Sequence, residues 1–398
     1  MSADAEIDPG PADTTDGAHR LRRGLESLIG IPATEGNRVD VLRNGDEVFP
    51  AMLEAIGGAE RNIDLTTFQF AEGQVVEDVS AALIERAQAG VRVRMIVDAI
   101  GSRWLPKHKV TELREGGVDF EIFRPPSNLR IWEQENRTHR KVLVVDNRVG
   151  FAGGVNTSKE WMGNARNPDE WRDTHLRIIG PAVDGLIAAF ATDWVDAGRM
   201  ACELDDEFPD QEQAGDQVVQ VVRGSAEKGW SDIANVLAAL LTLAQKKVRI
   251  TSAYFAPDDH FLGLLGDAAG RGVDVEVMLP GKNADQRFVQ LAAEAQFARL
   301  LDAGVRIWSY APTMIHAKIV LVDDLVACVG SANFDRRSMK LNHEIEVMVI
   351  DAGIVAELDR HYDEDVANSE QIIESRWAHR SKPQRVMEHL VRPLRGRF

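Results

Sequence analysis

The stretch HRKVLVVD at residues 139–146 returns as HAKIVLVD at residues 316–323. In both copies a histidine and a lysine stand two residues apart, and an aspartate follows the lysine after a run of apolar residues. Such a run is typical of a buried β-strand, on which residues two apart point to the same face. The histidine and the lysine are therefore expected side by side. Asp146 and Asp323 fall on the opposite face of an ideal strand, which predicts a structural role for both and not that of a catalytic base.

The repeat extends well beyond these motifs. The offset of 177 residues between the histidines also relates Gly153 to Gly330 and Asn156 to Asn333. Upstream, IDLTTFQF at residues 63–70 resembles VRITSAYF at residues 248–255. Each half alternates short β-branched runs with helical patterns, which is typical of α/β architecture. The sequence thus predicts two lobes related by a pseudo-twofold axis, each a mixed β-sheet flanked by helices.

The length and the charge pattern divide the chain. At 398 residues it exceeds what one hydrophobic core usually holds, so two lobes are expected. An acidic stretch without basic residues lies between the halves, and the balance of charge inverts near the C-terminus. We assign a disordered acidic tail to residues 1–20, the first lobe to 21–202, an acidic linker to 203–217, the second lobe to 218–370 and a basic tail to 371–398.

Composition excludes several classes of protein. The net charge of −17 disfavours a general nucleic-acid binder, whose affinity comes largely from Lys and Arg on phosphates. No apolar run approaches the roughly 18 residues that a membrane-spanning helix needs. The first residues lack the features of a signal peptide, and two distant cysteines, Cys202 and Cys328, make no disulfide framework. A cytoplasmic protein is expected.

The paired motifs suit chemistry at phosphorus. A neutral imidazole can attack a phosphodiester, and a lysine beside it can offset the negative charge that develops on the phosphoryl oxygens. The remaining histidines have no metal-ligand spacing, so we expect neither a metal nor a cofactor. His175 and His343 stand close to acidic residues beyond the motifs, and packing or a place at the rim of the site is expected for both.

These segments resemble a known superfamily. NRTHRKVLVVDNRVGFAGGVN at residues 136–156, EWRDTHLRIIGPAV at residues 170–183 and IHAKIVLVDDLVACVGSANFDRRSMKLNHEIEV at residues 315–347 look like the phospholipase D superfamily. Within it, the chain is most similar to bacterial cardiolipin synthases, here without N-terminal membrane helices. The likeness covers about residues 30–349 and implies the phospholipase D fold, with one active site between the two lobes.

The resemblance also implies a mechanism. One histidine attacks the phosphodiester and becomes a phosphohistidine, while the other protonates the departing alcohol and later deprotonates the acceptor. A carboxylate beyond each motif orients a histidine. The implied assignment pairs His139, as nucleophile, with Asp173, and His316, as general acid, with Glu344. The groups that cradle the phosphoryl oxygens are then Lys141, Asn156, Lys318 and Asn333.

The activity implied is phosphatidyl transfer, which joins two phosphatidylglycerols into cardiolipin and releases glycerol. The partners are then an anionic phospholipid and the inner face of the membrane, on which the protein would be peripheral; nucleic acid is not favoured and the oligomeric state is open. A hydrolytic phospholipase D, a phosphodiesterase or nuclease of the same superfamily, and a silent lipid-binding protein are the alternatives.

Two segments allow more than one interpretation. Residues 126–136 (PSNLRIWEQEN) have no counterpart in the second half and predict either a surface loop or a lip that receives acyl chains. Residues 376–398 carry seven Lys or Arg against one Glu, interspersed with apolar residues. They fit contact with an anionic membrane, a solvated charge run or a strap on the protein itself.

Overall fold

The computed structural model describes residues 14–125, 136–200, 208–225 and 232–378. The strands of the first half are β1 (Thr34–Arg43), β2 (Asn62–Thr67), β3 (Arg92–Asp98), β4 (Asp119–Phe123), β5 (Val142–Val145), β6 (Val149–Gly153) and β7 (Thr174–Ile179). Its helices are α1 (Thr14–Ile29), α2 (Asn44–Gly57), α3 (Gln74–Gln88), α4 (Lys107–Glu115), the 3-10 helix η2 (Lys159–Trp161) and α5 (Val183–Asp196).

The second half repeats this order. Its strands are β8 (Gln217–Gly224), β9 (Lys247–Thr251), β10 (Phe255–Ala256), β11 (Asp274–Pro280), β12 (Arg306–Tyr310), β13 (Ile319–Val322), β14 (Val326–Gly330), β15 (Phe334–Asp335), β16 (Glu344–Ile350) and β17 (Ser369–Ile372). Its helices are α7 (Asp232–Leu243), α8 (Asp259–Gly270), α9 (Arg287–Glu294), α10 (Phe297–Asp302), α11 (Arg336–Lys340), α12 (Ala352–Ala367) and α13 (Glu374–Ala378).

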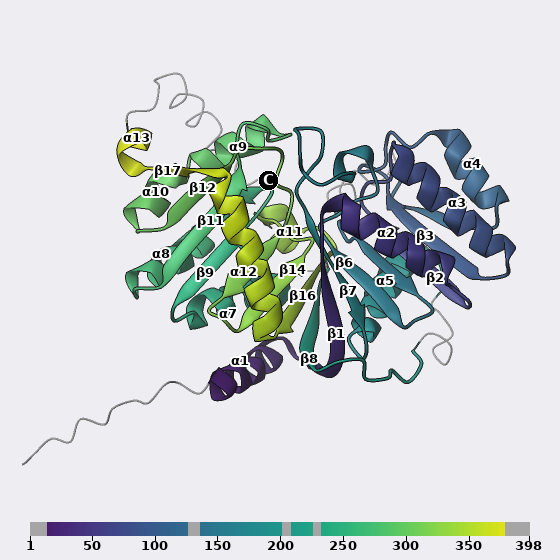
Figure 1. The fold of residues 1–398 in the computed structure, drawn as a ribbon, viewed down its shortest axis with the longest axis horizontal. Helices are drawn as coiled ribbons and strands as arrows, with labels where there is room; N and C mark the ends of the chain where they lie inside the picture. Colours follow the sequence, from purple (N-terminus) through teal and green to yellow (C-terminus); the bar gives the residue numbers. More distant parts are fainter. Residues whose placement is uncertain (1–13, 126–135, 201–207, 226–231, 379–398) are drawn as a thin grey trace, which may run out of the picture.

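One continuous sheet of 15 strands runs through both halves, in the order β17-β12-β11-β9-β13-β14-β16-β8-β1-β7-β6-β5-β2-β3-β4. The antiparallel pair of β1 and β8 joins the halves at its centre (Figure 1). Outward from this pair, β7-β6-β5-β2-β3-β4 matches β16-β14-β13-β9-β11-β12. The predicted pseudo-twofold α/β fold is confirmed, with the two predicted sheets fused into one.

The two halves also share a hydrophobic core. One apolar cluster fills the first half and another fills the second. A third packs α5 and β5–β7 of the first half against β13, β14, β16 and α12 of the second. Because this shared cluster lies beside the central strands, the ends of β5, β7, β13 and β16 are held in a fixed relation to one another.

The motif aspartates bind backbone amides at turns. Asp146 and Asp323 end β5 and β13 with left-handed backbone, at φ 53° and 51°, a conformation that Asp and Asn tolerate better than most residues. Asp146 accepts hydrogen bonds from the amides of residues 60, 61 and 62, just ahead of β2. Asp323 does the same for residues 245, 246 and 247, ahead of β9.

The structure revises two of the predicted boundaries. Residues 14–20, predicted as part of a disordered tail, belong to α1, which is amphipathic and buries Leu25 in the core of the second half. Residues 371–378, predicted as part of the basic tail, continue the fold: β17 pairs with β12, and Trp377 of α13 packs 5.0 Å from the ring of Phe297. The predicted lip at 126–135, most of the N-terminal tail and residues 379–398 lie outside the described residues. In the described part of the chain, no helix combines the length and the apolar character that crossing a bilayer requires.

Candidate active site

The two motif segments meet the opposite half of the molecule through their backbones. His139 N donates a hydrogen bond to His343 O at 2.8 Å, and His316 N donates to Arg172 O at 2.7 Å. Parallel bridges pair Thr138 with His343 and Ile315 with Arg172. Each motif histidine therefore lies beside the residues that lead into a sheet strand of the other half, β16 for His139 and β7 for His316.

This crossing decides which carboxylate orients which histidine. His139 Nδ1 lies 3.0 Å from Glu344 Oε2, and His316 Nδ1 lies 2.7 Å from Asp173 Oδ2. The sequence predicts the opposite pairs, His139 with Asp173 and His316 with Glu344, and that prediction is wrong. The reason is topological: a carboxylate that follows a motif in the chain opens a strand that runs against the other motif.

Both carboxylates are buried and held by further donors. Asp173 accepts hydrogen bonds from Trp161 Nε1 and from the amide of Thr174, both at 2.8 Å. Glu344 accepts one from Ser331 Oγ at 2.5 Å. Burial alone would raise the pKa of each carboxyl, but the facing histidine and the nearby lysine hold both pKa values below their usual range. The two groups are thus ionised acceptors at neutral pH.

The burial of the two histidines keeps them neutral. His139 is 8% exposed and His316 is 3% exposed. Burial lowers the pKa of both imidazoles, that of His316 to about 3. A neutral imidazole whose Nδ1–H is donated to a carboxylate keeps a lone pair on Nε2, which is the form that can attack phosphorus or accept a proton.

The lysines bring two positive charges into the same buried space. Lys318 Nζ lies 2.9 Å from Nε2 of His316, and Lys141 Nζ donates to His139 O at 2.6 Å and lies 5.4 Å from the Phe68 ring. Burial lowers the pKa of Lys318 to about 8, and burial together with the charge of Lys318 lowers the pKa of Lys141. The charge of Lys318 acts on Lys141, which fits lysines of the two halves that face one common site.

The motif asparagines are oriented by equivalent contacts. Asn156 Oδ1 accepts the amide of Gln69 at 3.0 Å, and Asn333 Oδ1 accepts the amide of Tyr254 at 3.3 Å. Gln69 and Tyr254 are matching positions of the upstream repeat. Both asparagines are buried, and this contact commits the side-chain oxygen of each to the backbone.

Aromatic rings surround the histidines, and the sequence did not predict them as part of the site. The Phe68 ring lies 5.0 Å from His139. His316 is enclosed by rings at 5.0, 5.4 and 6.4 Å, from Trp161, Trp171 and Tyr254 respectively. The available signal was the repeated segment before each motif, which contains Phe68 and Tyr254. These rings exclude water from the imidazoles and thereby strengthen the electrostatic interactions around them.

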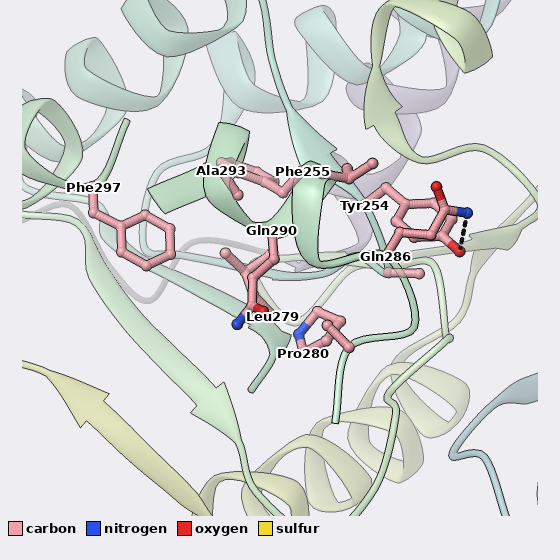
Figure 2. A pocket seen from close by; sticks show the side chains of 11 residues that line it. Tyr254, Phe255, Leu279, Pro280, Gln286, Gln290, Ala293 and Phe297 are labelled. Atoms are coloured by element: carbon pink, nitrogen blue, oxygen red, sulfur yellow. Dashed lines mark hydrogen bonds between the residues drawn. The ribbon is translucent and has the colours of Figure 1, made fainter. Parts of the chain in front are cut away.

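Tyr254 also lines a small cavity in the second half. The other lining residues are mostly apolar. They come from the segment between β9 and β10, the end of β11, the loop before α9, and α9 and α10 (Figure 2). At one end, Gln286 Nε2 donates to the Tyr254 hydroxyl at 3.1 Å, and that hydroxyl donates to Asp285 at 2.8 Å. Burial raises the pKa of Tyr254 well above its usual value, so the hydroxyl remains protonated.

The two other histidines considered from the sequence are buried, not at the rim. His175 packs against Gly153, where an added Cβ would come 2.7 Å from its Nδ1. Burial lowers the pKa of His175 to about 4. His343 Nδ1 bonds Asp193 of α5 at 2.8 Å. Gly154 is likewise required by packing, because an added Cβ would lie 2.2 Å from Asp173 Oδ1. Within the described ranges, no group of three or more His, Cys, Asp or Glu side chains is placed to hold a metal ion.

Comparison with known sequences finds relatives that match both halves of this chain. The family model "Cardiolipin synthase, PLD-like domain" matches residues 52–182 and 237–366. Cardiolipin synthase 1 of Bacillus cereus is 35% identical over 381 residues, covering 94% of this chain and 75% of its own. Cardiolipin synthase A of Pseudomonas aeruginosa is 37% identical over 351 residues, covering 87% of this chain and 71% of its own.

A solved structure supports the fold at lower identity. The phosphatidylserine synthase of Haemophilus influenzae superposes with a TM-score of 0.72 at 15% identity, covering 94% of this chain and 97% of its own. The two proteins therefore share one fold over most of this chain. With the family model on both halves and relatives above 30% identity along most of the sequence, the chain belongs to the cardiolipin synthase family of phospholipase D-like proteins.

Proposed function

We propose that this protein is a phosphatidyltransferase that joins two phosphatidylglycerols into cardiolipin and releases glycerol. The observation that carries the proposal is the buried pair of histidines, each bonded through Nδ1 to an ionised carboxylate of the opposite half. Two lysines stand beside them. This arrangement suits two successive proton and phosphoryl transfers at one phosphorus atom.

In the first step, His139 Nε2 attacks phosphorus and the bond to the leaving glycerol oxygen breaks. His316 donates the proton that this oxygen takes up. Burial keeps the His316 imidazole neutral without substrate, and the negative charge of a bound phosphodiester favours its protonation. Lys141 and Lys318 offset the charge on the phosphoryl oxygens, and the amide donors of Asn156 and Asn333 hydrogen-bond them.

In the second step, His316 takes the proton of an acceptor hydroxyl, which attacks the phosphohistidine and restores His139. The glycerol hydroxyl of a second phosphatidylglycerol is the proposed acceptor. The aromatic rings around His316 disfavour water at this position, which supports transfer over hydrolysis. We place the protein at the inner face of the membrane as a peripheral enzyme, since both substrates are lipids.

Purified protein incubated with vesicles of labelled phosphatidylglycerol tests the proposal. We expect cardiolipin and glycerol in equal amounts, and losses on the order of 10⁴-fold for His139→Ala and for His316→Ala. Thr192→Val on the surface side of α5 serves as the control for handling and folding. Phosphatidic acid as the sole product would make the enzyme a hydrolytic phospholipase D, and no lipid product would refute the lipid substrate.

A further inference from the structure

A buried acidic residue outside the motifs connects both members of the His139–Glu344 pair. Asp193, near the end of α5, is fully buried. Its carboxylate accepts hydrogen bonds from Thr138 Oγ1 at 2.7 Å and from Arg140 Nη1 at 2.8 Å, the residues on either side of His139. It also bonds His343 Nδ1 at 2.8 Å, and His343 directly precedes Glu344.

Arg140 ties this network to the carboxylate a second time. Its Nε donates to Glu344 O at 3.1 Å, and its Nη2 donates to Gly224 O at 2.9 Å at the end of β8. The guanidinium is 1% exposed and ion-paired with Asp193. The network thus fixes the backbone on both sides of a contact that joins two halves of the chain, the bond from His139 Nδ1 to Glu344.

The other histidine has related but different support. Arg172 Nη1 donates to Asp173 O at 2.6 Å, as Arg140 Nε does to Glu344 O. Arg172 takes the place of His343 and pairs with Asp365 of α12 at 3.0 Å. The positions that match Thr138 and Arg140, however, are Ile315 and Ala317, which cannot donate a side-chain hydrogen bond. Of the two motif segments, only that of His139 bonds a buried carboxylate through the side chains on either side of its histidine.

We propose that Asp193 is a positioning residue for His139, acting through Thr138, Arg140 and His343 to hold the imidazole and Glu344 in one geometry. The inference rests on the proposed function, in which His139 attacks phosphorus in line with the departing oxygen. In-line attack is sensitive to displacements of an ångström or less, so a nucleophile gains more than a proton carrier from rigid support. Asp193 itself contacts no reacting atom.

Nearly isosteric changes at Thr138 test the proposal and keep the ion pair between Arg140 and Asp193 intact. Thr138→Val removes the donor to Asp193, and Thr138→Ser keeps it. The matched control is Thr192→Val, one residue from Asp193 on α5, where the hydroxyl bonds only the helix backbone at Ala188 O. The substrate is a soluble nitrophenyl phosphodiester. We expect Thr138→Val to lower kcat and the rate of the initial nitrophenol burst about 10-fold, with KM unchanged. Thr138→Ser and Thr192→Val should retain wild-type values.

A second pair of variants and a second readout separate positioning from folding. His343→Asn places an amide donor where Nδ1 lies and should retain the burst, whereas His343→Leu should lose it. NMR of ¹⁵N-histidine-labelled protein should show the slowly exchanging Nδ1 proton of His139, identified by its absence in His139→Gln, in all variants except Thr138→Val and His343→Leu.

The outcomes distinguish this inference from the proposed function. Suppose that Thr138→Val and His343→Leu have lower Tm values but keep the wild-type burst rate and the Nδ1 proton. Asp193 would then have a structural role only, and the inference would be overturned. If these two variants lose the Nδ1 proton and the wild-type protein turns over no lipid, positioning by Asp193 is supported and the lipid transferase function is refuted.

Discussion

Each imidazole of the site takes its orientation from a carboxylate that belongs to the opposite half of the chain. Glu344 holds His139 and Asp173 holds His316, so neither half contains a complete catalytic pair. The charges nearly balance, with two lysines facing two carboxylates, which is what makes their joint burial tolerable. A single phosphodiester anion adds the negative charge that favours protonation of one imidazole.

The crossed pairs predict which carboxylate serves which step. A His316→Ala enzyme does not need a general acid for a substrate with a good leaving group, such as a nitrophenyl phosphodiester, so phosphohistidine should accumulate on His139. Adding Glu344→Gln should slow its formation about 10-fold or more, because the imidazole loses its orienting partner. Adding Asp173→Asn should change the rate much less. The adduct is measured as an acid-labile, base-stable modification of the peptide containing His139. An adduct on His316 in the His139→Ala enzyme would reverse the assigned roles.

Lys318 predicts the alkaline limit of activity. Its pKa is lowered to about 8 by burial, so the ammonium loses its proton as the pH rises through about 8. Activity that depends on this cation should be full below that pH and fall about tenfold per unit above it. Lys318→Arg, whose guanidinium stays charged, should be slower but lack this decline. The check is kcat/KM for a soluble diester between pH 6 and 10, which reports the pKa values of the free enzyme. An identical alkaline limb in the arginine variant would contradict the assignment.

The lowered pKa of Lys318 also determines how its contribution to the free energy of unfolding changes with pH. Because the folded pKa lies below the usual 10.5, the folded state binds this proton less readily than the unfolded chain does. The contribution of Lys318 to stability is therefore most favourable above pH 10.5, and is lost as the pH falls from there to about 8. At neutral pH the buried ammonium costs stability, on the order of a few kcal/mol. The site thus keeps a destabilising charge where the proposed chemistry uses one.

At the scale of elements, short strands place the histidines and the turns around them fix the strands. The residues of β5 and β13 are all buried, as continuous apolar runs predict. The aspartate that ends each strand binds three consecutive amides ahead of β2 or β9, which locks the edge of one strand to the start of its neighbour. The conserved spacing within the repeat is thus explained by architecture as much as by chemistry.

Adjacent aspartates test this structural role. Asp323→Ala removes the acceptor of three backbone amides and should lower the free energy of unfolding by about 2 kcal/mol. Asp324→Ala removes only an exposed contact 3.4 Å from Lys247 and should change it by less than about 0.5 kcal/mol. Denaturant titration gives both values. The kcat of each variant per folded molecule should stay near wild type, and a large fall for Asp323→Ala would show that the residue takes part in the chemistry.

The sequence predicts local features of this site better than contacts between halves. Periodicity identified the motif strands, and the shared offset identified His139, His316 and their lysines, because these signals lie within eight residues. The carboxylates were identified by resemblance, but their pairing depends on how β7 and β16 lie against the opposite motifs. That arrangement is set by the β1–β8 pair and the shared core, which involve residues about 180 positions apart. Asp193 was missed for the same reason, since nothing in the sequence of α5 points to Thr138.

At the scale of the whole molecule, the central strands and the shared core turn two half-sites into one. The apolar cluster between the halves includes residues of α5 and α12, the helices that carry Asp193 and Asp365. A change in the angle between the halves would therefore move both carboxylate contacts at once. The pairing of β1 with β8 is short and shifts register between Thr34 and Asn37, so the fixed spacing of the two histidines rests mainly on the shared core.

Charge is distributed unevenly along the sequence, and this distribution predicts how the protein binds an anionic membrane. The chain has a net charge of −17, which opposes approach to an anionic lipid surface. Residues 379–398 contain six Lys or Arg and one Glu, so they supply local attraction. Each cation near such a surface contributes about 1 kcal/mol, and salt weakens the effect.

Truncation after Ala378 isolates this contribution, because it keeps Trp377, which packs against the core of the second half. We expect the shortened protein to bind phosphatidylglycerol vesicles at least tenfold more weakly at low salt, and the difference to shrink at high salt as the Debye length falls. Binding to neutral phosphatidylcholine vesicles is the control and should be the same for both proteins. Turnover of a soluble diester should also be unchanged, since no described catalytic residue lies in the removed segment. Vesicle co-sedimentation measures the affinity. Equal affinity of the two proteins for anionic vesicles would exclude the tail as the membrane anchor. Lipid would then reach His139 and His316 through contact of the membrane with the surface around the active site.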